Sequence, residues 1–213
     1  MNTPFAASLD ESSTLVLPLA AIVHTHGDPA DELLASFAVD LRAQGLQVRG
    51  LIQHSTAPGK DKVMLIDLDS GQSWPLFQAL GSRSQSCSLD TTSLAAASIS
   101  LRRALDAAAD LVVANRFGAM EAEGRGLADE LLALMCAGQP LLTVVADKHL
   151  TAWRAFSGGY GVELPPERAA LERWFSSLPA QRSDGTRSAV VQAGRARRAG
   201  PGELSQGGGR AIA

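Results

Sequence analysis

Short apolar runs alternate with amphipathic helical segments along most of this chain. Apolar runs at residues 111–114 and 140–145 each follow a segment whose apolar residues recur at helical spacing. Strands that are linked through helices by short connections pair in parallel with right-handed crossovers. The alternation therefore predicts an α/β fold of three layers, in which helices cover both faces of a mainly parallel sheet. The apolar stripe before residues 111–114 consists of Leu94, Ala97, Leu101, Leu105 and Ala108. The stripe before residues 140–145 consists of Leu127, Leu131, Leu134 and Met135, and Gly138 ends that helix.

The N-terminal part of the chain begins with the same pattern. Apolar runs at residues 15–17 and 20–23 predict a first buried strand. A helix is predicted to follow, because Asp28 can cap its N-terminus and Pro29 suits its first position. Gly45 is predicted to end this helix, since glycine readily adopts the left-handed conformation found after a helix.

The middle of the chain departs from this alternation. Residues 48–53 predict a second strand. Residues 63–66 and 74–76 flank a turn at residues 67–71, which indicates an antiparallel hairpin excursion rather than another helical crossover. Asp90 is predicted to cap the long helix that comes next.

The C-terminal segment differs in charge from the rest of the chain. Residues 180–213 hold six arginines and two acidic residues, a net charge of +4, whereas the whole chain carries −3 and residues 1–179 therefore carry −7. The segment has many glycines and few large apolar residues, so it cannot bury enough surface to offset its ordering entropy. We predict a flexible N-terminus at residues 1–13, one domain at 14–178 and a disordered basic Gly/Arg-rich tail at 179–213. No aromatic residue interleaves the arginines, so the tail is interpreted as a solubilising terminus and nucleic acid is not an expected partner.

The composition also narrows the cellular setting. No apolar run approaches the roughly 18 residues that a membrane helix needs, so no membrane partner is expected. The first residues lack a basic region followed by a long apolar stretch, so we do not expect secretion. Cys87 and Cys136 cannot by themselves form a disulfide framework or a four-ligand zinc site, and both are interpreted as small core residues. A cytoplasmic protein is therefore the expectation.

Polar stretches follow several of the predicted strands at their carboxyl ends. In sheets of this kind, ligands bind at that edge. Residues 24–28, 115–121 and 146–149 come directly after three apolar runs, and residues 53–54 come after a fourth. Glycines at such an edge allow the backbone to approach a ligand closely. The candidate ligand-binding residues are Gly27, Asp28, Asn115, Arg116, Gly118, Glu121, Arg125 and Lys148.

Several short motifs give the chain a family resemblance. Residues 67–71 read Asp-Leu-Asp-Ser-Gly at the hairpin excursion, and residues 118–121 read Gly-Ala-Met-Glu after a buried strand. With these motifs, residues 18–175 resemble the thermophile-type nucleoside triphosphatases of the P-loop class. Residues 115–126 (N-R-F-G-x-x-E-x-x-G-x-G) and 87–90 (Cys-Ser-Leu-Asp) more closely resemble a bacterial domain-of-unknown-function family within that fold. Members of that family are often encoded beside molybdate-uptake genes, so the resemblance implies a P-loop-like fold and a role in molybdenum metabolism.

The sequence departs from that class at the phosphate-binding loop. Such a loop has the form G-x-x-x-x-G-K-[ST], in which backbone amides and a lysine hold phosphates and a hydroxyl holds Mg²⁺. Residues 24–31 contain no lysine and no second glycine, and Asp28 and Asp31 would repel a triphosphate. The acidic pair that serves magnesium in the triphosphatases aligns with Asn115 and Arg116. We therefore expect no ordinary ATP hydrolysis.

Arg116 and Glu121 each allow two interpretations. The guanidinium fork of Arg116 suits an oxyanion or a phosphate, with Arg125 and Lys148 as further cations and helix N-terminal amides as donors. Alternatively, Arg116 pairs with Glu121 or Glu123 in a solvated loop. Glu121 is either the acid that caps the next helix or a candidate catalytic base.

The four histidines are weak candidates for metal ligands. His24 and His26 alternate along an extended segment and would point to opposite faces, while His54 and His149 lie at other strand ends. No ligand spacing such as H-x₃-H or H-E-x-x-H supports a site. We therefore predict no metal centre.

An aromatic patch follows the last predicted strand. It consists of Trp153, Phe156 and Tyr160, with two glycines between the last two of these residues. Such a patch can stack on a nucleotide base or cover a partner surface. The simpler interpretation is that it packs a final helix, at residues 166–175, onto the sheet.

Two function hypotheses follow from these observations. In the first, the chain is a hydrolysis-deficient, P-loop-like accessory protein that binds a small anion, either a molybdate-like oxyanion or a nucleotide, and the molybdenum link comes from the resemblance alone. In the second, it is a nucleoside triphosphatase with a rebuilt site, in which Glu121 is the base and a histidine replaces the missing lysine. A scaffold that binds a protein partner is a third possibility. The cofactor is unknown, and a homo-oligomer stays open.

Overall fold

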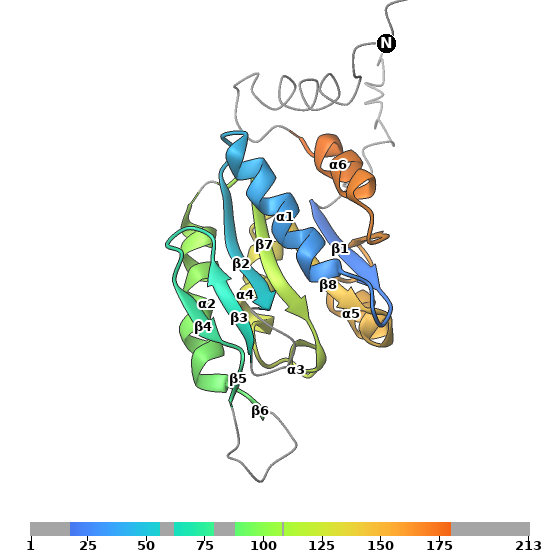
Figure 1. Ribbon diagram of the computed structural model, residues 1–213. Helices are drawn as coiled ribbons and strands as arrows, with labels where there is room; N and C mark the ends of the chain where they lie inside the picture. The colour runs from blue at the N-terminus through green and yellow to red at the C-terminus, as the bar shows by residue number, and fades with distance from the viewer. Residues whose placement is uncertain (1–17, 56–61, 79–87, 108, 180–213) are drawn as a thin grey trace, which may run out of the picture. The chain divides into compact units, whose positions relative to one another are not determined.

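Seven strands form one twisted sheet in the computed structural model, which describes residues 18–55, 62–78, 88–107 and 109–179 (Figure 1). The strand order is β4-β3-β2-β7-β8-β1-β9. In this order, the pairs β2–β7, β7–β8, β8–β1 and β1–β9 are parallel. Strand β3 pairs antiparallel with both β2 and β4, as the predicted hairpin excursion implies. The strands are β1 (Leu19–His24), β2 (Val48–Ser55), β3 (Val63–Asp67), β4 (Ser73–Pro75), β7 (Leu111–Phe117), β8 (Leu141–Ala146) and β9 (Val162–Leu164), and a separate pair is formed by β5 (Phe77–Gln78) and β6 (Ser88–Leu89).

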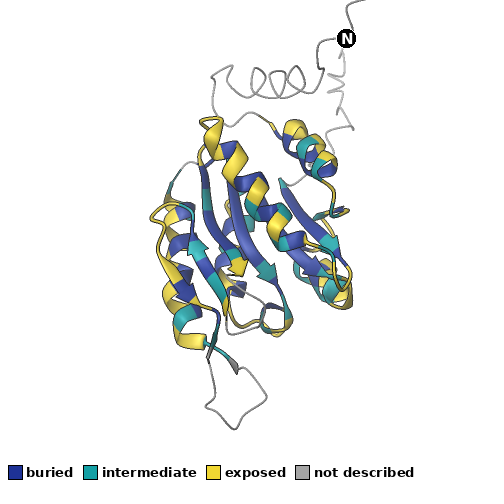
Figure 2. Cartoon of the chain, in the orientation of Figure 1, coloured by how far each residue is buried: buried dark blue, intermediate teal, exposed yellow. Residues whose placement is uncertain are grey.

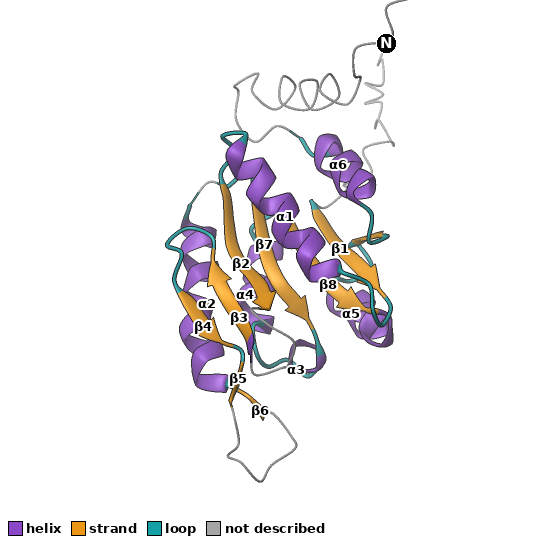
Figure 3. Cartoon of the chain, viewed as in Figure 1, coloured by secondary structure: helices purple, strands orange, loops and turns teal. Residues whose placement is uncertain are grey.

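Helices cover both faces of this sheet (Figure 3). Helix α1 (Ala30–Ala43) lies on one face, and α2 (Thr91–Asp106), α4 (Ala128–Cys136) and α5 (Leu150–Phe156) lie on the other (Figure 1). The short helix α3 (Ala119–Ala122) follows β7, and the 3₁₀ helix η2 (Asp147–His149) follows β8. The three-layer α/β architecture is therefore as predicted. No helix in the described parts of the chain is long and apolar enough to cross a membrane.

The chain divides into two compact units, Met1–Leu171 and Glu172–Ala213. The sheet and helices α1 to α5 belong to the first unit, and helix α6 (Arg168–Ser177) spans the division. The predicted domain borders stay predictions, because residues 1–13 and nearly all of the tail at 179–213 lie outside the described residues. The interpretation of Cys87 lies outside them as well.

The first helix forms where it was predicted, but its capping differs. Leu34, Phe37 and Leu41 are buried on one face of α1, and Gly45 follows the helix with a φ of 88°. The prediction that Asp28 caps α1 is wrong. Its carboxylate instead accepts hydrogen bonds from the backbone N–H and the hydroxyl of Thr25, both at 2.8 Å. The first turn of α1 consequently has no side-chain cap.

The second long helix confirms its predicted cap. The Asp90 carboxylate accepts hydrogen bonds from the backbone N–H groups of Thr92 and Ser93, both at 3.0 Å. Leu94 and Leu101 of the predicted apolar stripe are buried against the sheet. Sequence periodicity was sufficient here because both the cap and the stripe are local features.

Three further differences concern strands and burial. Strand β9 pairs with β1 and was not predicted, because its three residues are too short to show a period. Strand β7 runs to Phe117, so Asn115 and Arg116 lie in the strand rather than after it. The prediction that Cys136 is a core residue is wrong, since it is exposed at the end of α4.

Strands β1, β7 and β8 are buried along nearly their whole length (Figure 2). Gly50 makes close strand pairing possible at β2, because a Cβ atom there would lie 2.0 Å from the carbonyl oxygen of Val113. In the aromatic patch, the ring centroids of Trp153 and Phe156 lie 5.3 and 5.1 Å from that of Phe117. Trp153 is fully buried, whereas Tyr160 is 63% exposed and takes no part in this core.

Candidate functional site

The carboxyl ends of the parallel strands meet at one edge of the sheet, where α1 also begins. His24 ends β1, Gln53 lies near the end of β2, and Asn115 and Arg116 lie near the end of β7. Because β7 is the middle strand of seven, its polar residues lie between those of its neighbours. This edge brings together residues from three of the predicted stretches, those at 24–28, 53–54 and 115–121.

A β-bulge at Asn115 determines where Arg116 points. Ala114 pairs with Thr143 of β8 and Arg116 pairs with the next residue, Val144, so Asn115 is an extra residue in β7. The Thr143 hydroxyl donates a 2.7 Å hydrogen bond to the Asn115 carbonyl. Ala114 and Phe117 belong to the core on the α2–α4 side. Regular alternation would place Arg116 on that same side, but the extra residue turns it toward α1.

On the α1 side, Arg116 forms a bidentate ion pair with Asp31. Its Nε lies 2.9 Å from Oδ1 and its Nη2 lies 2.6 Å from Oδ2. The Arg116 side chain is 38% exposed and that of Asp31 is 13% exposed. The alternative that Arg116 pairs with Glu121 or Glu123 is therefore wrong. Asp31 holds the guanidinium side-on, which leaves Nη1 and one hydrogen of Nη2 unused by this pair.

Two amide side chains extend this pair into a network. Gln53 donates from Nε2 to Asp31 Oδ2 at 3.0 Å, and Asn115 donates from Nδ2 to Gln53 Oε1 at 3.1 Å. The Asn115 Oδ1 atom is buried and has no hydrogen-bond partner among the described residues. We call Asp31, Gln53, Asn115 and Arg116 the Asp31 network. Sequence reasoning treated Asp31 as a charge that would repel a triphosphate and did not connect it with Arg116.

The loop between β1 and α1 is closed by Asp28. The hydrogen bond from the Thr25 backbone N–H, and then that from the Thr25 hydroxyl, hold the pKa of the Asp28 carboxyl below its ordinary value. Gly27 adopts a φ of 97° with open space around its Cα. The loop is thus fixed by its own contacts, and the first amides of α1 lie beside it without a side-chain cap.

The Glu121 carboxylate binds backbone N–H groups. Its Oε2 accepts a hydrogen bond from the backbone N–H of Gly118 at 2.9 Å, and its Oε1 accepts one from Leu127 at 3.1 Å. The residue is 7% exposed. Gly126, with a φ of 64°, passes so close that a Cβ atom there would lie 2.3 Å from Oε1. The carboxylate therefore caps the starts of α3 and α4, in agreement with the capping interpretation.

Arg125 and Lys148 do not join Arg116. The Arg125 guanidinium pairs with the exposed Glu123 carboxylate, and Lys148 is exposed in η2. Among the described residues, no hydrogen bond or ion pair links either cation to the Asp31 network. Of the three predicted cations, only Arg116 is fixed at the centre of this edge.

The histidines do not converge either. His24 is 8% exposed, and its Nδ1 lies 2.8 Å from the Thr25 carbonyl. His26 and His54 are exposed and His149 is half-buried. No group of three or more His, Cys, Asp or Glu side chains that could hold a metal ion occurs in the described parts of the chain.

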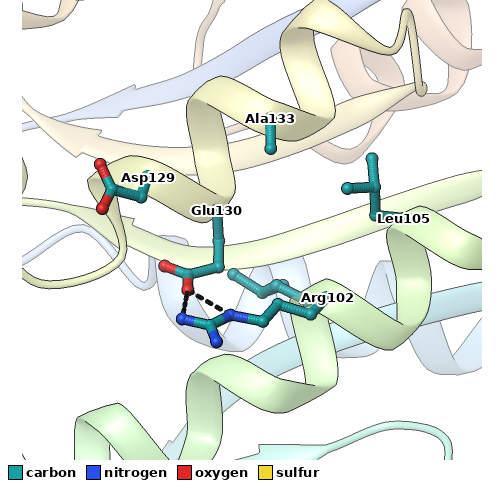
Figure 4. A pocket seen from close by; sticks show the side chains of 6 residues that line it. Arg102, Leu105, Asp129, Glu130 and Ala133 are labelled. Atoms are coloured by element: carbon teal, nitrogen blue, oxygen red, sulfur yellow. Dashed lines mark hydrogen bonds and ion pairs between the residues drawn. The ribbon is translucent and has the colours of Figure 1, made fainter.

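A separate pocket of about 220 Å³ lies between α2 and α4 (Figure 4). The Arg102 guanidinium reaches across it to the Glu130 carboxylate, with Nη2 at 2.7 Å and Nε at 2.9 Å from Oε1. Glu130 is nearly buried, whereas Arg102 is exposed. The ion pair joins the two helices, and nothing in the sequence had pointed to this position. The lining residues are Leu101, Arg102, Leu105, Asp129, Glu130 and Ala133.

Comparison with known proteins places the whole sheet in a family. Residues 19–174 match the model of a family described as "Protein of unknown function (DUF2478)". The chain belongs to the DUF2478 family. The match runs from the start of β1 into α6 and includes every residue of the Asp31 network. The predicted resemblance to a domain-of-unknown-function family is thereby confirmed.

Two individual proteins are similar to this DUF2478 chain. The "Molybdenum import ATP-binding protein ModC 2" of Bradyrhizobium diazoefficiens is 40% identical over 160 residues, which cover 74% of this chain. The chain spans only 18% of the length of that relative. The solution structure of a human cancer-related nucleoside triphosphatase matches with a TM-score of 0.51 and 14% identity, over 85% of this chain and 99% of that one. The DUF2478 chain therefore has the P-loop-like nucleoside triphosphatase fold that was predicted.

Proposed function

We propose that this protein is a hydrolysis-deficient, P-loop-like accessory protein that binds a small oxyanion or a nucleotide at the carboxyl edge of its sheet. The observation that carries the proposal is the pairing of Arg116 with Asp31. This pairing fixes a guanidinium at the centre of the edge, and among the described residues no other hydrogen bond uses its remaining N–H groups, which suit an anionic ligand. A cation held in one orientation loses little entropy when it binds an anion, which favours an anion as the ligand.

The start of α1 supports an anionic ligand in the same place. The first turn of α1 has no side-chain cap, because the Asp28 carboxylate is engaged with Thr25. Within that turn, among the described residues, only the Ala30 amide is bound locally, to the Asp28 carbonyl at 2.9 Å. Free amides and the helix dipole attract phosphates and other oxyanions. Apart from Gly27 and its chain neighbours, no atom of the described residues lies within 4 Å of the position that a Cβ atom of Gly27 would take, so a ligand can approach the backbone of the preceding loop there.

The same residues argue against hydrolysis. Residues 24–31 bring no lysine to the phosphate position, and Asn115 and Arg116 stand where the fold's acidic pair would hold magnesium. Both oxygens of Glu121 accept backbone hydrogen bonds, which gives this carboxylate a capping role rather than that of a base. The protein is therefore expected to bind its ligand without cleaving it.

The link to molybdenum rests on the relative. A segment 40% identical to this chain forms part of a protein named for molybdenum import and ATP binding. Because the chain spans 18% of that protein, import and ATP binding remain properties of the relative, and a part in handling molybdate in the cytoplasm is our proposal for this chain.

A thermal-shift series with the purified full chain tests the proposal. Molybdate, tungstate, sulfate and phosphate are compared with ATP and GTP, each with and without magnesium. A ligand at 100 times its Kd adds about 2.7 kcal/mol to the folded state, which gives a clear shift. Arg116→Ala should abolish the shift. Arg154→Ala is the matched control, because Arg154 makes a similar side-on pair with Glu163 elsewhere on the surface.

The outcomes separate the two function hypotheses. A shift that needs no magnesium and is lost only in Arg116→Ala supports the accessory role. Magnesium-dependent release of phosphate from ATP or GTP would instead favour the triphosphatase. An unchanged melting temperature with every anion and nucleotide would refute ligand binding at this edge and leave a scaffold.

A further inference from the structure

The Asp31 network has a fixed direction of hydrogen bonding. A carboxylate only accepts, so the end of Gln53 that faces Asp31 must be its NH₂ group, at 3.0 Å. The Gln53 oxygen then faces Asn115, and the end of Asn115 that faces it must be the NH₂ group, at 3.1 Å. The charge of Asp31 thereby determines, through one intervening amide, which atom of Asn115 is left over. That atom is the acceptor Oδ1.

The Asn115 oxygen is buried without a donor. Asn115 is 6% exposed, and its Oδ1 has no hydrogen-bond partner among the residues that the structure describes. Buried polar atoms in native proteins nearly always have a partner, because an unpaired one costs free energy. Asn115 is also linked to Arg116 through Gln53 and Asp31, so its oxygen belongs to the same network as the guanidinium that would bind the proposed anion. The Asp31 network thus contains donors that suit an anion and one acceptor that lacks a donor.

We infer that this site selects an anion that itself carries a hydrogen-bond donor, such as a protonated phosphate group, over oxyanions without one. The inference rests on the proposed function, since it concerns the ligand of the same edge. Among the ligands proposed there it favours one that bears a phosphate over molybdate, so that a part in molybdenum metabolism would not depend on molybdate held at this edge. At neutral pH sulfate and molybdate present only acceptor oxygens, which would face the lone pairs of Asn115 Oδ1. Inorganic phosphate keeps an O–H group and can donate it. Sites that hydrogen-bond one substrate group strongly reject analogues that lack it.

Gln53 acts as a positioning residue in this selection. Without Gln53, the Asn115 amide could rotate and offer its NH₂ group to a fully deprotonated oxyanion. The Gln53→Leu variant should therefore keep anion binding through Arg116 but lose the preference among anions. Gln44→Leu is the matched control, because Gln44 is exposed at the opposite end of α1.

Titration calorimetry on the purified full chain at neutral pH tests the inference. The probes are inorganic phosphate, AMP, sulfate and molybdate. The phosphate of AMP is mostly dianionic at neutral pH, so AMP carries its donors on the ribose and the base and shows whether a nucleotide, rather than a P–OH group, supplies the donor. We expect phosphate or AMP to bind about tenfold more tightly than sulfate or molybdate, the factor for one buried acceptor left unpaired. The ratio should fall to about one in Asn115→Leu and Gln53→Leu and stay unchanged in Gln44→Leu.

The outcomes distinguish this inference from the proposed function. Sulfate or molybdate binding as tightly as phosphate and AMP in the wild type would overturn donor selection and leave anion binding intact. No binding of any of the four probes would refute the proposed function itself. If Asn115→Leu does not fold, the wild-type ratio and Gln53→Leu still decide the matter, and a ratio that survives Gln53→Leu would contradict the positioning role.

Discussion

Replacing Glu121 with glutamine separates a capping role from a catalytic one. The carboxylate accepts backbone hydrogen bonds from Gly118 at 2.9 Å and from Leu127 at 3.1 Å, in a site that is 7% exposed. Glutamine keeps one acceptor oxygen, but its NH₂ group would face the other backbone N–H. One charge-assisted hydrogen bond is lost and one buried donor is left unpaired, which costs about 2–3 kcal/mol. For a chain of this size, that lowers the melting temperature by about 5–10 °C.

Thermal and urea unfolding, followed by circular dichroism, measure this loss. Glu123→Gln is the matched control, since the Glu123 side chain is 59% exposed and should change the free energy of unfolding by less than about 0.5 kcal/mol. A base that only serves chemistry could be replaced by glutamine without loss of stability. If Glu121→Gln unfolds within about 0.5 kcal/mol of the wild type, the capping argument fails.

Two further predictions concern other parts of the sheet. Gly50→Ala should destabilise the fold by more than about 3 kcal/mol or prevent folding, because the new Cβ would lie 2.0 Å from a carbonyl oxygen of β7 and the φ of residue 50 is 105°. Recovery of a soluble Gly50→Ala variant with an unchanged urea midpoint would contradict this. The hydrogen bonds from Arg154 hold the pKa of Glu163 below its ordinary value, so this pair stabilises the fold above that value and its contribution is lost as pH falls through the lowered pKa. Acid unfolding of the wild type and of Glu163→Gln, compared side by side, measures this contribution. It is small because both side chains are partly exposed. Identical acid-unfolding curves for the two proteins would show that the pair contributes nothing.

The order of strands and helices could be predicted because its signals are local. The stripe of α2, its cap at Asp90 and the stop of α1 at Gly45 each depend on residues within a few positions of one another. The arrangement around Arg116 depends on strand order instead. Its partner Asp31 lies 85 positions away in the sequence, and the two meet only because β7 lies in the middle of the sheet, under α1.

The bulge explains why the candidate site was only half predicted. The carboxyl-end rule selected Asn115 and Arg116 as candidates, but the direction of each side chain depends on an extra residue opposite Thr143 of β8. No sequence period reveals a bulge, since it arises from pairing with a strand that comes later in the chain. Cys136 was wrongly predicted to be buried for a related reason. Helix α4 is apolar on most sides, so a helical-wheel projection of its sequence does not show which face packs against α2.

The position of β7 also decides what a bound ligand would do to the protein's dynamics. With three strands on either side of it, β7 cannot open without breaking its ladders to both β2 and β8. Local fraying therefore cannot release a ligand held by Arg116, whereas a site on an exposed loop could open by itself. Ligand binding at this edge would slow amide hydrogen exchange throughout the central strands, so that a ligand in a small site would change exchange rates across the sheet.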